Sequence, residues 1–313
     1  DDRFETRVND HRVGYFVNKS TDLTSYDNFP NFALINKWRL IKKDPNAEMS
    51  EPEEPIVFWV ENTTPEEIIP AVVAGIENWN MAFEEAGFIN AVVAKIQPKD
   101  AEWDAADYDY NVVRWSSEPD GNLLGIGPSV TNPLTGEIIS GDVVNKLLAV
   151  KVGYNYRKLY GYTEDNDPLM QYITNLTLHE VGHVLGLRHN FRGSYLYSPA
   201  EIHNKEITGK TLMSSVMDYD PINVAPEGTE QGIYFSTVPG VYDKWAIKFG
   251  YTPGLTDEER TEILRQSVKR ELSFGTDEEA MSSPGNNIDP RTKRYDMSND
   301  PIAYAEDIIE IVD

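Results

Sequence analysis

The sequence predicts an α+β fold in two lobes, and three observations support this prediction. Short apolar runs typical of strands dominate the chain up to residue 145. A long apolar segment that carries three histidines follows. Beyond it, long loops give way to helix-like segments. This order favours a mixed, twisted sheet with a backing helix and a histidine-bearing helix in the N-terminal lobe, and irregular and helical structure in the C-terminal lobe.

The chain divides into three predicted parts. Residues 1–54 form an extension with two short strand candidates, at 13–17 and 38–42. Residues 55–189 form the N-terminal lobe, and residues 190–313 form the C-terminal lobe. With 313 residues, the chain is long enough for one large domain or for two lobes around one cleft.

A backing helix is predicted to start where Thr64, Pro65 and Glu67 combine a capping box with proline at the first helical position. It runs to Ala86 and ends at Gly87. The strand candidates of this lobe lie at residues 56–60, 91–96, 110–116 and 137–145. The stretch from 125 to 145 is the candidate for a sheet edge above a cleft, where an extended peptide could add as a strand.

The histidine-bearing helix has its own start and stop signals. Asp167 is the expected N-cap, and Pro168 suits the first helical position. Apolar residues along the segment predict a helix that is buried over much of its surface. Gly186 is the expected end, because glycine adopts the left-handed conformation without a β-carbon penalty.

One string in this helix carries chemistry. His179, Glu180, His183, Gly186 and His189 form the pattern H-E-x-x-H-x-x-G-x-x-H. On a helix, residues four apart share a face, with β-carbons about 5–6 Å apart, so the first two histidines can bind one ion from the same side. The third histidine returns after the glycine turn and completes a set of three imidazoles.

Three neutral histidines bind Zn²⁺ and leave a fourth position open, which is the pattern of a catalytic site. A water at that position, with a pKa of about 7, and Glu180 as general base would attack a polarised carbonyl. The alternative is a core helix whose histidines only form hydrogen bonds. That alternative would account for a single histidine better than for five residues at fixed spacing.

A second string, S-S-V-M-D-Y at residues 214–219, follows the histidines. A zinc-binding string followed by a methionine turn resembles the metzincin clan of metallopeptidases. The resemblance implies that Met217 lies beneath the zinc-binding imidazoles; the alternative for this methionine alone is core packing. It also implies that Tyr219 can ligate zinc and then hydrogen-bond the tetrahedral intermediate, as a tyrosine does at this offset in the astacin and serralysin branches.

Further strings resemble a bacterial family of large zinc-dependent metallopeptidases: WRLIKKDP, SEPEEPIVFWV, AGIENWNMAFEEAGF, HEVGHVLGLRHNF, SVMDY and YDKWAIKFGY. The resemblance covers residues 13–305. It implies the catalytic part of a longer precursor with flanking domains, and a secreted, periplasmic or cell-surface location. Asn190 stands where several metzincin branches carry Asp or Glu, so the resemblance does not imply their salt bridge from that position. By analogy, residues 220–226 form one wall of the specificity pocket, and Ile222 and Val224 favour an apolar or mid-sized substrate side chain.

Two helices are predicted in the C-terminal lobe. Residues 241–249 form the first, closed by Gly250. Residues 256–272 form the second, with Thr256 as N-cap and Glu259 three residues later. The C-terminal end, rich in Asp, Asn, Pro and Gly, is interpreted as irregular structure that wraps the lobe.

Composition limits the partners and cofactors. The net charge of −24 argues against nucleic acid and anionic membranes, because both need clustered Lys and Arg. No run approaches the roughly 20 apolar residues of a membrane span. The sequence has 0 cysteines, so no disulfide forms and no thiolate of this chain can block a zinc ion. Acidic clusters at 164–167 and 286–300 make Ca²⁺ a minor alternative cofactor, although neither matches an EF-hand.

Taken together, the residues predict a zinc-dependent endopeptidase that acts on protein or peptide substrates. The three histidines bind zinc, Glu180 activates the zinc-bound water and passes its proton to the leaving amine, Tyr219 stabilises the oxyanion, and Met217 supports the metal base. Two alternatives remain open. One is another zinc hydrolase, an amidase or exopeptidase that acts on small substrates. The other is a catalytically silent binding module that keeps the zinc site, against which the intact Glu180 argues.

Overall fold

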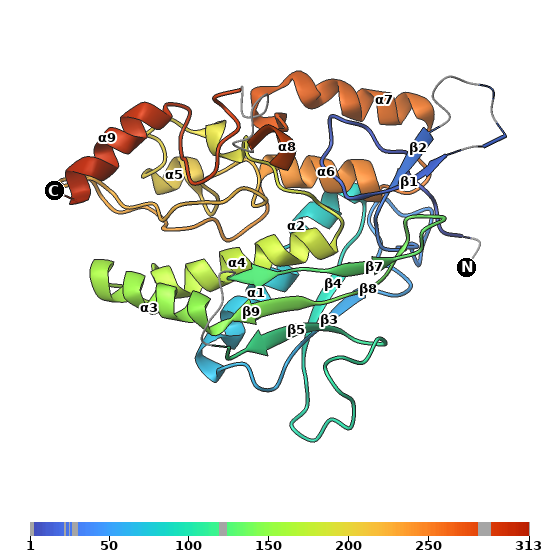
Figure 1. Ribbon diagram of the computed structural model, residues 1–313, viewed down its shortest axis with the longest axis horizontal. Helices are drawn as coiled ribbons and strands as arrows, with labels where there is room; N and C mark the ends of the chain where they lie inside the picture. The colour runs from blue at the N-terminus through green and yellow to red at the C-terminus, as the bar shows by residue number, and fades with distance from the viewer. Residues whose placement is uncertain are drawn as a thin grey trace.

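A five-stranded mixed sheet forms the base of the N-terminal lobe in the computed structural model (Figure 1). The structure describes residues 3–21, 23–24, 26, 31–118, 124–280 and 289–312. The strands of this sheet, in spatial order, are β4 (Val92–Ile96), β3 (Ile56–Val60), β5 (Asn111–Ser116), β9 (Val143–Lys146) and β6 (Gly125–Ile126). The first four run parallel, and the edge strand β6 runs antiparallel to β9.

Two further antiparallel pairs lie outside this sheet: β1 (Val17–Thr21) with β2 (Asn31–Ile35), and β7 (Ser129–Thr131) with β8 (Ile138–Gly141). The α-helices are α1 (Ile69–Glu77), α2 (Asn80–Phe83), α3 (Leu147–Tyr160), α4 (Pro168–Val184), α5 (Lys205–Thr208), α6 (Val241–Tyr251), α7 (Asp257–Arg265), α8 (Asp277–Ala280) and α9 (Pro301–Val312). Figure 1 shows α4 between the sheet and the C-terminal segments, which are coloured orange to red. The α+β class predicted from the sequence is confirmed.

Apolar side chains on both sides of α4 join into one large core. Strand β3 alternates buried and half-buried residues, and Phe58 is fully buried against the helices. The same core includes Val13 of the N-terminal extension, Leu178 of α4, and Met217 and Trp245 of the C-terminal lobe. All three predicted parts therefore contribute to one core, and their boundaries at residues 54 and 189 stay a prediction. Among the described residues, no helix is long and apolar enough to cross a membrane.

Helix α4 begins and ends as predicted. The Asp167 side chain accepts a hydrogen bond from the backbone N–H of Leu169 at 3.0 Å, and proline occupies the first helical position. At the other end, Gly186 has a φ of 97°. Its N–H donates to the carbonyl of His183, and the N–H of Leu187 donates to that of Gly182, which together form a Schellman motif. This turn sends the chain back towards the helix, and it thereby sets the direction of the third histidine.

The N-terminal extension holds this turn from outside. The N–H of Phe16 donates to the carbonyl of Gly186 at 2.8 Å, and the N–H of Arg188 donates to that of Gly14 at 2.9 Å. The predicted strand at 13–17 is therefore wrong: Tyr15 makes only an isolated bridge to Leu187, and β1 begins at Val17. The predicted strand at 38–42 is wrong for a related reason. Its backbone bonds to scattered partners instead of one neighbouring strand.

The predicted helix over residues 64–86 is divided into α1, α2 and two 3₁₀ turns, although it ends at Gly87 as expected, with a φ of 83°. Tertiary hydrogen bonds explain the division. Asn78 donates to the carbonyl of Thr237, and Asn80 accepts from the N–H of Val92. The Thr64 capping box is also wrong, because Pro65 is the N-cap and no side chain caps the turn.

In the C-terminal lobe, the Thr256–Glu259 capping box is confirmed, but α7 ends at Arg265 instead of residue 272. Helix α6 continues through Gly250 to Tyr251. A β-carbon at Gly250 would overlap the ring of Tyr15, so glycine is needed there for close packing and not for termination. Helices α3 and α9 are absent from the sequence prediction, which interpreted the C-terminal end as irregular.

Gly186→Ala is predicted to destabilise the protein strongly. An alanine there would be held in the left-handed conformation, and its β-carbon would overlap the carbonyl oxygen of Asn36. We expect a loss of about 3 kcal/mol or more in the free energy of unfolding, measured by chemical denaturation. Gly228→Ala is the control, because its φ is 82° but nothing lies within 4 Å of a β-carbon. It should lose only about 1 kcal/mol; equal losses in both variants would contradict the steric explanation.

Candidate metal centre

The structure brings His179, His183 and His189 together. One ring nitrogen of each lies within 4.8 Å of the others, and the Nε2 atoms of His183 and His189 are 3.2 Å apart. The first two histidines lie one turn apart on α4, and the third returns from the Gly186 turn. Within the described part of the chain, this is the sole cluster of three or more histidine and carboxylate side chains at metal-binding spacing.

Each imidazole is oriented by an oxygen atom on its far side. The Nδ1–H of His179 donates to the carbonyl of Val216 at 2.7 Å, and that of His183 donates to the carbonyl of Leu187 at 2.9 Å. The Nδ1–H of His189 donates to Oδ1 of Asp277 at 2.9 Å. Because carbonyl and carboxylate oxygens only accept, these bonds place the ring proton on Nδ1 and leave a lone pair on each Nε2.

This arrangement fits a zinc ion. Two nitrogen ligands about 2.0–2.1 Å from a tetrahedral metal lie about 3.3 Å from each other, close to the 3.2 Å between His183 and His189. Burial, followed by the neighbouring histidines, lowers the pKa of His179 well below its usual range. The same causes lower the pKa of His183 to about 4. Both rings are therefore neutral at pH 7, and facing lone pairs favour a cation between them.

Glu180 lies beside the histidines, beneath the edge strand. A β-carbon at Gly125 of β6 would be 2.7 Å from Oε1 of Glu180, and one at Gly127 would overlap the Glu180 carbonyl. No described residue donates a hydrogen bond to this carboxylate, which is 7% exposed. Burial raises the pKa of Glu180 to about 8. A cation at the histidines would lower it, because an opposite charge stabilises the carboxylate.

Met217 packs directly beneath α4. A β-carbon at Gly182 would overlap the sulfur of Met217, so only glycine leaves room for the methionine at this point. The buried carboxylate of Asp243 holds the turn that carries it: Asp243 accepts from Ser215 Oγ at 2.6 Å and from the N–H of Val216 at 2.8 Å. The turn in this way presents the Val216 carbonyl to His179. Asp243 lies in the string YDKWAIKFGY, and no local pattern there predicts this role.

The Tyr219 ring borders the cluster. Its centroid is 5.4 Å from that of His179 and 4.8 Å from that of His189, and Tyr295 stacks on its outer side. No described residue forms a hydrogen bond with its hydroxyl. Burial, followed by Glu180, raises the pKa of Tyr219 to about 12, so the phenol keeps its proton at neutral pH.

Asp277 is the functional residue that sequence reasoning missed. It lies 88 positions from His189, at the start of α8, in a stretch interpreted as irregular. Asn190 connects the two: its side chain donates to the carbonyl of Ser273 at 3.0 Å and accepts from the N–H of Gly275 at 3.1 Å. Position 190 carries no acid, but Asn190 holds the segment that places the carboxylate of Asp277 beside His189. A local signal existed for α8, since Thr276 and Glu279 are spaced as a capping box, but nothing indicated its contact with the histidine.

The predicted calcium sites find no support. Within the described residues, no group of carboxylates lies at metal-binding spacing. Asp167 instead caps α4 and pairs with Arg157. Part of the second acidic cluster, residues 286–288, lies outside the described residues.

The mixed sheet with its antiparallel edge strand, the three-histidine centre and the methionine beneath it define a metallopeptidase of the metzincin type. Residues 162–313 match the protein family described as Met-zincin. That segment contains α4, the returning histidine and the methionine turn. The metzincin resemblance seen in the sequence is therefore confirmed. A comparison with curated proteins finds no similar sequence.

Asp277→Ala is predicted to lower zinc affinity about ten- to a hundredfold, because His189 loses the carboxylate that orients its ring. Competition with a chelator of known affinity measures the effect, and Asp277→Asn should restore part of it. The matched control is Glu278→Ala, since Glu278 pairs with Arg188 at 2.8 Å and is largely exposed. That variant should stay within about twofold of wild type. Wild-type affinity in Asp277→Ala would show that His189 does not depend on Asp277.

Proposed function

We propose that this metallopeptidase is a zinc-dependent endopeptidase, with His179, His183 and His189 as the zinc ligands. The observation that supports the proposal is the convergence of three Nε2 lone pairs beside an available carboxylate and beneath the edge of a sheet. When bound, zinc would act as a Lewis acid that polarises the scissile carbonyl and lowers the pKa of a water molecule.

Glu180 is the proposed general base and acid. Its carboxylate lies next to the histidines, and no described residue competes for its oxygens. Its Oε1 would accept a proton from the attacking water and then pass that proton to the leaving amine. The buried position keeps bulk water away from this transfer, which strengthens the electrostatic interactions within the site.

Tyr219 is the proposed oxyanion donor. Its hydroxyl keeps its proton at neutral pH and has no partner among the described residues, so it can donate to the charge that develops on the carbonyl oxygen. The packing of its ring between His189 and Tyr295 limits its freedom. Met217 is proposed to support the metal base through its contact with α4.

The edge strand β6 is the proposed binding site for substrate. It pairs with β9 on one side and with no described strand on the other. An extended peptide could add there as an antiparallel strand and run past the zinc ligands in both directions, which favours cleavage within a chain. The proposal includes three further points. Residues 220–226 form one wall of the specificity pocket. The protein has a secreted, periplasmic or cell-surface location, and flanking domains belong to a longer precursor.

Glu180→Gln is predicted to keep about one zinc per chain and to lose roughly three to four orders of magnitude in turnover, because no group remains to move the proton. Metal analysis and cleavage of an internally quenched peptide measure the two quantities. Turnover near the wild-type rate would remove Glu180 from the mechanism.

Tyr219→Phe is predicted to slow turnover by about a hundredfold, less than the loss in Glu180→Gln, because it removes one hydrogen-bond donor to the oxyanion. Zinc content should be unchanged. The matched control is Tyr295→Phe, whose hydroxyl belongs to the outer ring of the stack. If both variants cleave at the wild-type rate, Tyr219 has no role in stabilising the oxyanion.

The experiment that tests the whole proposal is cleavage of a denatured-protein library by wild type and Glu180→Gln, with amino-acid amides and short unblocked peptides assayed in parallel. Internal cuts by wild type alone support an endopeptidase. Activity confined to amides or chain ends would favour the other zinc hydrolases. Zinc without any cleavage in either protein would favour a silent binding module.

A further inference from the structure

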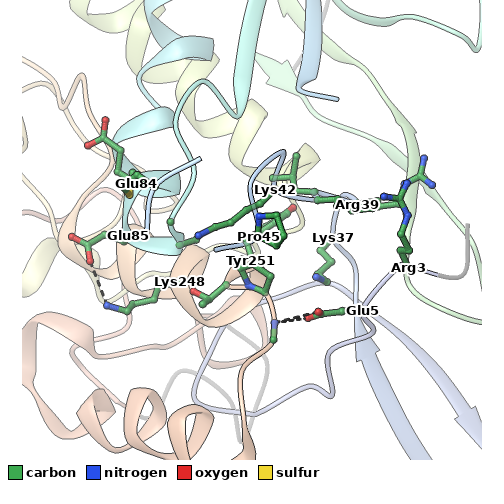
Figure 2. A pocket seen from close by; sticks show the side chains of 18 of the residues that line it. Arg3, Glu5, Lys37, Arg39, Lys42, Pro45, Glu84, Glu85, Lys248 and Tyr251 are labelled. Carbon is green, nitrogen blue, oxygen red and sulfur yellow. Dashed lines mark hydrogen bonds and ion pairs between the residues drawn. The ribbon is translucent and has the colours of Figure 1, made fainter. Parts of the chain in front are cut away.

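A cavity of about 780 Å³ lies apart from the metal centre (Figure 2). Its walls come from the N-terminal segment, residues 37–49, the 3₁₀ turn η2 (Glu84–Ala86) and the end of α6. None of the zinc-binding candidates lines it, nor does Glu180 or Tyr219. Its volume falls within the range of small-molecule sites, about 300–1,000 Å³. The cavity is thus a separate candidate binding site.

The side chain of Lys37 is a buried cation in this cavity. The residue is 6% exposed, and its Nζ lies 5.3 Å from the ring centre of Phe4 and 5.7 Å from that of Tyr251. Figure 2 shows the amine turned towards Glu5, with no ion pair drawn between them. Within the described ranges, no residue accepts a hydrogen bond from this Nζ. An ammonium has three donors. The Lys37 Nζ is not among the fully enclosed side-chain atoms, and the residue lines the cavity, so these donors are open to an acceptor that enters it.

The charges around Lys37 do not balance. Arg7 is a second buried cation nearby, 4% exposed; its Nη2 donates to the carbonyl of Thr252 at 2.7 Å, whereas its Nε has no partner among the described residues. The carboxylate that acts on both cations is that of Glu5, which already accepts from the N–H of Gly254 at 2.9 Å. Two cations and one carboxylate leave one positive charge. Burial, followed by the charge of Arg7, lowers the pKa of Lys37 to about 8, so the Lys37 amine is mostly in its protonated ammonium form at pH 7.

The other cations at this cavity already have partners. Lys42 donates to the carbonyls of Ala47 and Glu48, and Lys248 lies 3.6 Å from the carboxylate of Glu85. Arg3 pairs with Glu53 at 2.9 Å. The wall also carries acidic side chains, which would repel a ligand of high negative charge. A single negative charge therefore matches the site better than two.

Apolar side chains form another part of the wall. Phe4 and Tyr251 flank Lys37, and Pro45 and Met49 line the cavity further along. Such surface contributes roughly 25 cal/mol per Å² of apolar ligand area that it removes from water. A ligand that combines one carboxylate with an apolar body satisfies both the unpartnered ammonium and these walls. We propose that this cavity binds a small monocarboxylate, with its carboxylate on Lys37 and its apolar part against Phe4 and Met49.

The test uses the zinc-loaded chain and isothermal titration calorimetry. N-acetyl-leucine is the carboxylate probe, and its amide is the uncharged control. The carboxylate should bind and the amide should not. Lys37→Met, which keeps a long apolar side chain, should weaken binding of the carboxylate at least about tenfold. Lys43→Met is the matched control, because Lys43 pairs with Glu51 at 2.7 Å outside the cavity; it should bind like wild type.

A second pair of variants leaves Lys37 in place. Met49 is 38% exposed at the cavity, so Met49→Glu adds a negative charge without disturbing the core. It should weaken binding several-fold, and Met49→Gln should not. Equal binding to wild type and Lys37→Met would overturn the proposal, since the carboxylate would then occupy another place such as the zinc site. Failure to bind at about 10 mM would overturn it too, and inorganic phosphate binding as tightly as the carboxylate would contradict a monocarboxylate site.

Discussion

Three hydrogen bonds behind the imidazoles determine how the metal centre is built. Each Nδ1–H meets an oxygen from a different place: the methionine turn, the loop after Gly186, and α8. An imidazole without such an acceptor could rotate or change its tautomer, and its Nε2 would no longer face the common point. The surrounding structure is best understood as the means of placing these three acceptor oxygens.

Each acceptor depends on a further buried polar residue or a glycine. Asp243 fixes the turn that offers the Val216 carbonyl, and Gly186 allows the return that offers the carbonyl of Leu187. Asn190 fixes the segment that leads to Asp277. These polar groups are buried but hydrogen-bonded, so their desolvation is compensated. The apolar contact of Met217 with Gly182 then fills the space beneath α4.

Sequence reasoning succeeded where the signal is local. The spacing of the histidines, the Asp167 cap, the Gly186 turn and the Thr256 capping box each depend on residues a few positions apart, and each is present in the structure. The strands at 56–60 and near 92–96 were found because their apolar runs are continuous or alternate regularly.

It failed where long-range contacts override local preference. The backbone at Tyr15 bonds to a turn 172 positions away instead of a neighbouring strand, as the bridge to Leu187 shows. Asn78 and Asn80 divide a segment with good helical periodicity because their side chains bond to other parts of the fold. Asp277 and Lys37 illustrate the same limit at functional positions. Lysine and aspartate are usually exposed. No pattern in the sequence marks Asp277, which contacts His189, or Lys37, which is buried at a cavity.

The distant origin of the orienting oxygens has a consequence for how the protein folds and holds metal. The histidine string is local, so an unfolded chain can already chelate zinc, but loosely, because its rings must be ordered one by one. The native chain has ordered them through contacts that span up to 88 positions. By linkage, the native chain binds zinc more tightly than the unfolded chain does, and at saturating zinc the difference between the two binding free energies equals the gain in the free energy of unfolding. Contacts of such long range cost loop-closure entropy and slow folding. Under the proposed zinc binding, tight metal retention would therefore measure whether the whole chain, from the N-terminal extension to α8, has reached its native arrangement.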